Sequence, residues 1–289
     1  MATYRSLFST FLFILFSCFI MSGYGEAVHA AELESDEVQV TTPVYFPVGD
    51  YEFREGTFQY EVSWQGIPAA LAQITTKKSG DRYEVYMSAR TNKVVDIFYR
   101  LRYAALGSLS ALDFSPGYLQ IDQRENQKVT KAIIRFSETG RIQSELTKTG
   151  KDPKEYDFTS ENFTMEPLSA AFLARSLAWK PGDVREFDTF DGKTRYLITL
   201  KCVDLISVKV NNEKRRVWVV EPKVVNLNKN EKSKKLRKAH IYVTADKYRD
   251  LLQLQSEVFV GSVTTKLKSF KPLPREAVSL AQNVNFGES

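Results

Sequence analysis

Few side chains of this sequence can act as nucleophiles, general bases or soft metal ligands. The chain has two cysteines and two histidines, and we expect Cys18 and His29 to be removed with an N-terminal targeting segment, which leaves Cys202 and His240. A Ser-His-Asp or Cys-His arrangement would need His240, the nucleophile elbow G-x-S-x-G does not occur, and a His/Cys metal site lacks ligands. We expect no metal and no cofactor, and the sequence favours a protein that is not an enzyme.

Alternation along two strand-like stretches indicates where these two residues face. In "YLITLKCVDLIS" Cys202 shares one face with Ile198 and Leu200, which makes it a small buried hydrophobe rather than a reactive thiol. In "KAHIYVTAD" His240 points away from the apolar residues Ile241 and Val243. We therefore expect His240 at the surface.

Paired carboxylates are the remaining catalytic hypothesis. A glycosidase needs two carboxyl groups roughly 5 to 9.5 Å apart, and the sequence assigns no partner to several carboxylates. Local explanations compete with this hypothesis, because Asp191-Gly192 fits a hairpin turn and Asp113 ends a strand. The candidates are Asp96, Asp113, Asp188, Asp191 and Glu221.

Aromatic residues crowd the first half of the chain. On an alternating strand face they usually form core, but a curved sheet that does not close presents a concave apolar face for acyl chains or sugar rings. Arg175 falls on the apolar stripe of a helix, so we expect it to bond a carboxylate or strand carbonyls, with an acidic ligand group as the alternative. The residues proposed to bind ligand are Tyr60, Trp64, Tyr83, Tyr86, Phe98, Arg175 and Trp179.

A second candidate surface is the basic stretch "KVVNLNKNEKSKKLRKAH". Lysines commonly keep loops soluble, so a solvated loop is one interpretation. The other is a surface for anionic partners such as lipid headgroups, lipid A phosphates or acidic glycans. The net charge of +5 is mild and predicts no nucleic-acid partner. The residues of this surface are Lys229, Lys232, Lys234, Lys235, Arg237 and Lys238.

The elements that would carry these residues are mostly short strands. "TFQYEVSWQ" alternates with a period of two, and turn signals such as Ser79-Gly80-Asp81 and Asp191-Gly192 separate the stretches that follow. One stretch, "EPLSAAFLARSLAWKPGD", predicts a helix over 167–179 that begins at Pro167 and stops before Pro181-Gly182. The sequence predicts a mainly β fold: a long, strongly curved antiparallel sheet, a half-barrel or open barrel, with one central packed helix.

The ends of the chain are expected to lie outside this β domain. Arg5, an apolar run of about fifteen residues and the small residues before Ala31 form a signal-peptide pattern, and the run is shorter than the roughly twenty residues that span a bilayer. We expect a signal peptide at 1–30, a lead-in or linker at 31–50, the β domain at 51–272 and a tail at 273–289. Localisation is expected to be periplasmic, with lipidation at Cys18 as the less favoured alternative.

Several stretches, taken in order, resemble one family of exported bacterial proteins. "FQYEVSWQGIPAALAQI", "LSAAFLARSLAWKPGD", "FDGKTRYLITL" and "AHIYVTADKYRDLLQLQSEVFVGSVTTKL" are similar to the opening strands, central helix, Asp-Gly hairpin and final strands of domain of unknown function 3108. The resemblance covers roughly 53–270. It implies a periplasmic curved sheet with a packed helix, similar to the half-barrels of periplasmic lipoprotein carriers, and it transfers no catalytic residues. The long basic link after "VVEP" departs from the family pattern.

Together these features predict a non-enzymatic periplasmic protein that binds an envelope component on a concave, aromatic-lined sheet. The component would be a lipid, a lipid-linked molecule or an acidic glycan. The alternatives are an envelope scaffold acting through protein contacts and a cell-wall glycan hydrolase using a carboxylate pair. Peripheral contact with a membrane surface is compatible with the basic link, and the oligomeric state stays open.

Overall fold

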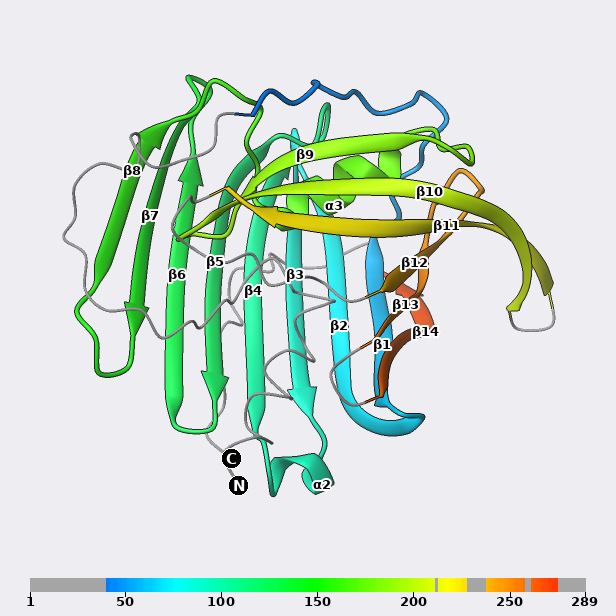
Figure 1. The fold of residues 1–289 in the computed structure, drawn as a ribbon, viewed down its shortest axis with the longest axis horizontal. Helices are drawn as coiled ribbons and strands as arrows, with labels where there is room; N and C mark the ends of the chain where they lie inside the picture. Colours follow the sequence, from blue (N-terminus) through cyan, green and yellow to red (C-terminus); the bar gives the residue numbers. More distant parts are fainter. Residues whose placement is uncertain (1–39, 211–212, 228–237, 258–260, 275–289) are drawn as a thin grey trace.

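Fourteen strands and two short helices make up the described part of the chain (Figure 1). The computed structural model describes residues 40–210, 213–227, 238–257 and 261–274, so the signal segment expected at 1–30 lies outside the described residues. The helices are α2 (Lys93–Asp96) and α3 (Pro167–Ser176). The strands are β1 (Gly56–Trp64), β2 (Ile67–Ser79), β3 (Arg82–Thr91), β4 (Leu101–Ser110), β5 (Pro116–Glu125), β6 (Lys128–Phe136), β7 (Arg141–Lys148), β8 (Lys154–Thr159), β9 (Val184–Phe190), β10 (Arg195–Val210), β11 (Glu213–Asn226), β12 (Ala239–Thr244), β13 (Leu251–Glu257) and β14 (Ser262–Pro272).

All fourteen strands belong to one antiparallel sheet. Its order is β8-β7-β6-β5-β4-β3-β2-β1-β14-β13-β12-β11-β10-β9. The first and last strands pair with each other, with Phe58 opposite Phe270, and β8 and β9 are the two edges. The mainly β, antiparallel class that the sequence predicts is confirmed, and within the described residues no backbone pairing of β8 with β9 closes the sheet.

Local sequence explains the hairpins. Side chains of β1 alternate between buried and half-buried positions, as the period-two pattern predicts. Gly80 in the β2–β3 turn has φ of +61° and Gly192 in the β9–β10 turn has φ of +94°, conformations that glycine adopts at little cost. The carboxylate of Asp191 accepts the backbone N–H of Thr194 at 2.8 Å. Both turns lie where the sequence predicts them.

Helix α3 is shorter than the sequence predicts. It begins at Pro167 but ends at Ser176 rather than at 179, because Leu177 is already extended, with ψ of 152°. The indole N–H of Trp179 then donates to the carbonyl of Ala174 at 2.8 Å. This carbonyl would otherwise accept a backbone N–H of a further helical turn, so Trp179 caps the helix from outside it.

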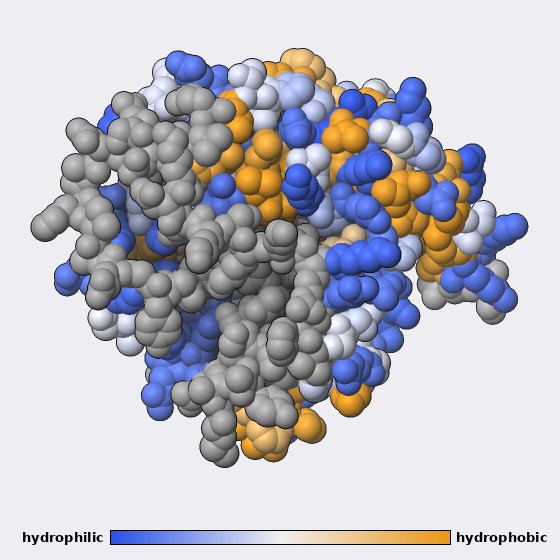
Figure 2. All heavy atoms as spheres, viewed as in Figure 1, coloured by the Kyte–Doolittle hydropathy of each residue, from blue (hydrophilic) through white to orange (hydrophobic). Residues whose placement is uncertain are grey.

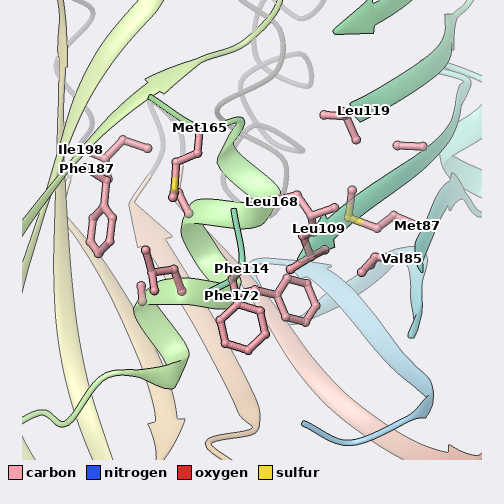
Figure 3. Close-up of a cluster of buried hydrophobic side chains, with 14 of the residues drawn as sticks. Val85, Met87, Leu109, Phe114, Leu119, Met165, Leu168, Phe172, Phe187 and Ile198 are labelled. Atoms are coloured by element: carbon pink, nitrogen blue, oxygen red, sulfur yellow. The ribbon is translucent and has the colours of Figure 1, made fainter. Parts of the chain in front are cut away.

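Helix α3 lies between the two halves of the sheet, and its buried side chains belong to the main apolar core (Figure 3). Leu168 and Phe172 of α3 point toward buried side chains of β3 and β4, including Met87 and Leu109. Phe187 of β9 and its neighbours belong to the same continuous apolar cluster. Helix α3 therefore packs against strands from both halves of the sheet.

The two edge strands approach each other through side chains. Phe158 of β8 and Phe190 of β9 pack edge to face with ring centroids 5.1 Å apart. The hydroxyl of Ser144 on β7 donates to the carbonyl of Gly192 at 2.8 Å. The β9–β10 hairpin thus rests on β7 and β8 without extending the hydrogen-bonded sheet.

The segment before β1 packs on the domain. Figure 1 shows it crossing from the β8 side over α3 to the strands at the other end. Val48 N–H donates to the carbonyl of Ser176 at 3.0 Å, and Glu52 N–H donates to the carbonyl of Lys247 at 2.9 Å. The described part of the expected lead-in therefore belongs to the fold and covers the end of α3.

Candidate functional site

Three of the aromatic residues proposed to bind ligand are packed against the protein itself. Tyr60 is 3% exposed, and its hydroxyl donates to the carbonyl of Leu251 at 3.3 Å. Tyr83 stacks on Phe53 with ring centroids 3.9 Å apart. Trp179 is buried against the end of α3. The rings that the sequence hypothesis placed on an open face fill space between the sheet, α3 and the segment before β1.

The other three aromatic candidates lie elsewhere. Trp64 ends β1 and packs on a small separate cluster that includes Val62. Tyr86 is on β3 but on the face opposite to Tyr83, because the two are three residues apart on a strand. Phe98 follows α2 and is 76% exposed. The structure thus does not gather the proposed aromatic residues on one face.

Of the six basic residues proposed for the anionic surface, one lies within the described residues. Lys238 is exposed just before β12. The remaining five fall in 228–237, outside the described residues: Lys229, Lys232, Lys234, Lys235 and Arg237.

Arg175 makes the contacts that the sequence predicts for it. Its Nε donates to the backbone carbonyl of Arg249 at 2.8 Å, and its Nη2 lies 4.0 Å from a carboxylate oxygen of Asp250. Arg175 is in the last turn of α3, and Asp250 directly precedes β13. The side chain therefore ties the helix end to the sheet and leads to a cluster of charges.

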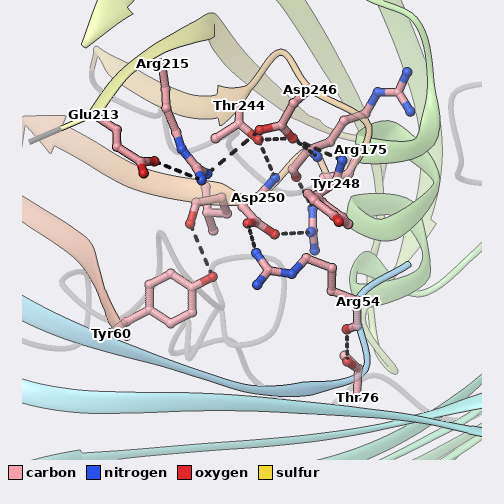
Figure 4. A network of polar contacts seen from close by, with 12 residues as sticks. Arg54, Tyr60, Thr76, Arg175, Glu213, Arg215, Thr244, Asp246, Tyr248 and Asp250 are labelled. Atoms are coloured by element: carbon pink, nitrogen blue, oxygen red, sulfur yellow. Dashed lines mark hydrogen bonds and ion pairs between the residues drawn. The ribbon is translucent and has the colours of Figure 1, made fainter. Parts of the chain in front are cut away.

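Two arginines converge on the carboxylate of Asp250 (Figure 4). Arg54, from the segment before β1, donates from Nη1 at 2.5 Å, and Arg175 approaches from α3. The side chain of Asp250 is 2% exposed. Burial raises the pKa of Asp250, while Arg175 and Arg54 act in the opposite direction. The side chain of Asp250 thus connects the segment before β1 and helix α3 to the β12–β13 turn.

Arg249 is a buried cation with unused hydrogen-bond donors. It is 4% exposed, and its guanidinium carbon lies 5.4 Å from the ring centroid of Tyr51 and 5.8 Å from that of Trp218. Its Nη2 contacts Asp50 at 3.1 Å, and the side chain of Asp50 is 74% exposed. Nε and Nη1 have no hydrogen-bond partner within the described part of the chain. Buried arginine donors normally find acceptors, so this position is unusual.

The turn between β12 and β13 fixes Arg249 in place. The carboxylate of Asp246 accepts the backbone N–H groups of Tyr248 and Arg249 at 3.0 and 3.1 Å. Asp250 N–H donates to the hydroxyl of Thr244 at 2.8 Å. Arg249 has φ of +46°, a left-handed conformation that is costly for a non-glycine residue. The turn thus holds a strained arginine backbone where a glycine or asparagine would fit better.

The arrangement can bind an anion. The guanidinium groups of Arg54 and Arg175 face one buried carboxylate, Asp250. The guanidinium of Arg249 contacts one exposed carboxylate, Asp50. A planar guanidinium matches a carboxylate or phosphate through Nη2 together with Nε or Nη1, and low exposure strengthens that attraction. Of these residues, sequence reasoning found Arg175. The signal for Arg249 and Asp250 was the Asp turn in "TADKYRD", which the sequence indicated as a turn only.

The carboxylates considered for glycan hydrolysis all have structural partners. Asp96 is paired with Arg102, Asp188 with Arg195 and Glu221 with His240. Asp191 and Asp113 accept backbone N–H groups of their own turns. The described residues contain no group of three or more His, Cys, Asp or Glu side chains placed to hold a metal ion.

The lone cysteine and histidine of the β domain are placed as follows. Cys202 is fully buried, which confirms the sequence interpretation. His240 is half-buried, and its Nε2 lies 3.0 Å from a carboxylate oxygen of Glu221. Cross-strand pairing with the neighbouring β11 therefore accounts for His240.

A family model described as "Protein of unknown function (DUF3108)" matches residues 59–268. The chain belongs to this family. The match confirms the resemblance seen in the sequence and includes most of β1, all of β2 to β13 and most of β14. The DUF3108 match stops short of Arg54 and of the segment before it, so part of the arginine cluster comes from outside the matched region. No curated protein has a significantly similar sequence.

One solved structure among the matches shares the fold of this DUF3108 protein. The chain is similar to a crystal structure of a β-barrel-like protein of domain of unknown function DUF1849 from Brucella abortus, with a TM-score of 0.54 and 10% identity over 76% of this chain and 98% of that one. It also matches a protein from Bacteroides fragilis described as exported with a YmcC-like fold, at a TM-score of 0.32 and 9% identity over 79% and 99% of the two chains. A third match, described as a lipoprotein from Parabacteroides distasonis, has a TM-score of 0.30 and 10% identity over 81% and 100%.

Neither helix of the described residues has the length and apolar character that crossing a bilayer requires. Helix α3, the longer one, has ten residues.

Proposed function

We propose that this DUF3108 protein, exported to the periplasm, binds an envelope component through an anionic group held by Arg249. The component carries a carboxylate or phosphate, as a lipid, a lipid-linked molecule or an acidic glycan does. The protein acts as a binding protein and carries out no reaction on the ligand.

The observation that supports this proposal is the state of the Arg249 guanidinium. A buried charge costs several kcal/mol unless it is paired and hydrogen-bonded, and the partner that Arg249 does have, Asp50, is mostly exposed. Two of its nitrogens lack acceptors among the described residues. A ligand anion that replaces Asp50 at Nη2 would pair in a bidentate geometry, with Nη2 and with one of the two nitrogens that lack acceptors, Nε or Nη1.

Asp50 is suited to be exchanged for a ligand. It lies in the segment before β1, and its carboxylate is the exposed member of an ion pair whose arginine is buried. Water can solvate the exposed Asp50 carboxylate once it is released, and the ligand anion would take its place on the buried guanidinium, so that Arg249 stays paired. A ligand anion would compete with the Asp50 carboxylate for the same guanidinium.

The apolar part of such a ligand would lie beside the cluster. Leu251, Leu267 and Phe270 are half-buried side chains of β13 and β14 that pack against the core. The guanidinium of Arg54 lies 3.7 Å from the ring centroid of Phe270. A sheet curved into a half-barrel would present these side chains on its concave side, next to the arginines, and this curvature is part of the proposal.

The test is mass spectrometry of the protein purified from the cell envelope under native conditions. We expect an additional mass that organic or aqueous extraction releases, as a lipid or a glycan respectively, and that contains phosphate or carboxylate. Arg249→Gln should lose this mass, whereas Arg141→Gln, an exposed arginine of β7 paired with Asp157, should retain it. Circular dichroism of each variant checks that the fold is intact.

Asp50→Asn provides a second test that does not depend on removing a buried residue. With short-chain phosphatidylglycerol as the probe, we expect this variant to bind at least fivefold more tightly than the wild type, because the competing carboxylate is gone. An unliganded wild type together with unchanged probe affinity in Asp50→Asn would overturn the proposal. A defined protein partner captured by crosslinking in cells, without any released small molecule, would favour the scaffold alternative.

A further inference from the structure

Large apolar side chains are exposed close together where β2 begins and β3 ends, next to α2. Nine large hydrophobic residues are exposed among the described residues, and five of them lie there. Single exposed apolar side chains are ordinary, but a contiguous group marks a contact surface. The five are Ile67, Leu71, Val94, Ile97 and Phe98, with exposures of 64%, 51%, 70%, 75% and 76%.

These side chains come from two neighbouring segments. Ile67 and Leu71 are on β2, and the other three lie in or just after α2, on the β3–β4 connection. The side chain of Asn92 donates to the carbonyl of Pro68 at 2.6 Å, which fastens the connection to β2. In Figure 1 α2 extends beyond the ends of β3 and β4, and Figure 2 shows apolar surface at the same place.

Polar side chains at the base of the connection are hydrogen-bonded or ion-paired. Asn92 caps α2 by accepting Val95 N–H at 2.9 Å. Arg102 binds the carboxylate of Asp96 at 2.6 Å, and the hydroxyl of Thr91 also donates to that carboxylate. The tip can therefore enter a less polar medium without leaving these groups unpaired.

Basic residues surround the apolar tip. The stretch from 90 to 102 contains Arg90, Lys93, Arg100 and Arg102 against the single acidic residue Asp96. Lys93 and Arg100 directly flank the exposed apolar residues and are themselves exposed. An apolar tip with a basic surround matches an anionic bilayer surface, where the apolar side chains enter the interface and the cations meet headgroups.

We propose that the α2 tip docks this protein on an anionic phospholipid surface, with Val94, Ile97 and Phe98 entering the interface and Lys93 and Arg100 contacting headgroup phosphates. This site is distinct from the arginine cluster around Asp250, which lies at the C-terminal end of α3. The two proposals stand on different residues, so either can fail without the other.

Cosedimentation with vesicles tests the docking surface. We expect the wild type to bind vesicles of phosphatidylglycerol and phosphatidylethanolamine and to bind phosphatidylcholine vesicles at least tenfold more weakly. Ile97→Ser combined with Phe98→Ser should weaken binding to the anionic vesicles at least tenfold. Lys93→Gln and Arg100→Gln should each weaken it about fivefold, and added salt should reduce the difference.

Leu112→Ser is the matched control, because Leu112 is 86% exposed in the β4–β5 turn, at the opposite end of β4 from α2. It should leave vesicle binding unchanged. The proposal is overturned if the wild type does not sediment with anionic vesicles, or if the Ile97 and Phe98 variant binds as the wild type does. The proposal is also overturned if the wild type binds no vesicles but forms a dimer in sedimentation velocity, and the same double variant is a monomer. The surface would then bind a second copy of the chain.

Discussion

Glu166 should make the stability of this protein depend on pH in a way that one substitution removes. Its side chain caps the N-terminus of α3, with both carboxylate oxygens accepting Ser169 N–H at 2.9 Å. The residue has no exposed surface. Burial raises the pKa of Glu166 from 4.5 to about 7, although the hydrogen bonds from Ser169 oppose this shift.

The sign and magnitude follow from the two pKa values. Between about 4.5 and about 7 the folded chain holds a proton on Glu166 that the unfolded chain has released, so this contribution to stability is complete below pH 4.5 and is lost as pH rises to about 7. Between pH 5 and pH 8 the loss is about 2 to 3 kcal/mol. That is a substantial share of the roughly 5 to 15 kcal/mol that stabilises most folded proteins.

Glu166→Gln keeps the shape and one acceptor oxygen but cannot titrate. We expect the unfolding free energy of the variant to exceed that of the wild type by about 2 to 3 kcal/mol more at pH 8 than at pH 5. Urea unfolding followed by tryptophan fluorescence at pH 5, 6, 7 and 8 measures this difference. Other buried carboxyls with raised pKa, such as Asp191, titrate equally in both proteins and cancel.

Glu155→Gln, at an exposed position on β8, controls for the loss of one negative charge. Its stability should follow that of the wild type across the same pH range. A constant difference between wild type and Glu166→Gln at all four pH values would refute the reasoning, because the titrating group would then lie elsewhere.

Two further predictions concern the interior. Gly192→Ala places a Cβ 3.2 Å from both Ile134 and Ser144 at a φ of +94°, and we expect it to lower the unfolding free energy by about 1 to 3 kcal/mol in urea titrations. Gly150→Ala, with φ of +71° and nothing within 4 Å, should cost less because only the backbone is strained, and an equal loss would contradict the contact argument. Cys202 is fully buried and burial raises the pKa of its thiol, so in the chain beginning at Ala31 it should react with an aromatic disulfide reagent only after unfolding. Reaction of the native protein on the time scale of a free thiol would show that Cys202 is accessible.

Local patterns in the sequence determined the elements of this fold. Alternation in β1 and the Asp191-Gly192 turn depend on residues within a few positions of each other, so strand periodicity and turn chemistry identify them directly. The same periodicity separates Tyr83 from Tyr86, since an odd spacing places them on opposite faces of β3. The order and spacing of these elements also sufficed to identify the DUF3108 family.

The end of α3 was decided by tertiary contacts. The apolar stripe continues to Trp179, which made a longer helix the natural prediction. In the folded chain Trp179 turns back to cap Ala174, and Val48 N–H takes the carbonyl of Ser176. A partner more than a hundred residues away in sequence thus ends the helix, and no local pattern signals it.

The arginine cluster likewise exists only in three dimensions. Arg54 and Asp250 are 196 positions apart in sequence, and Arg175 joins them from the middle of the chain. Their meeting requires β1 and β14 to pair at the centre of the sheet and α3 to lie across it. Sequence periodicity fixes which face a side chain occupies, whereas long-range strand pairing fixes which charges share that face, and this is why the sequence pointed to Arg175 and only the structure pointed to Arg249.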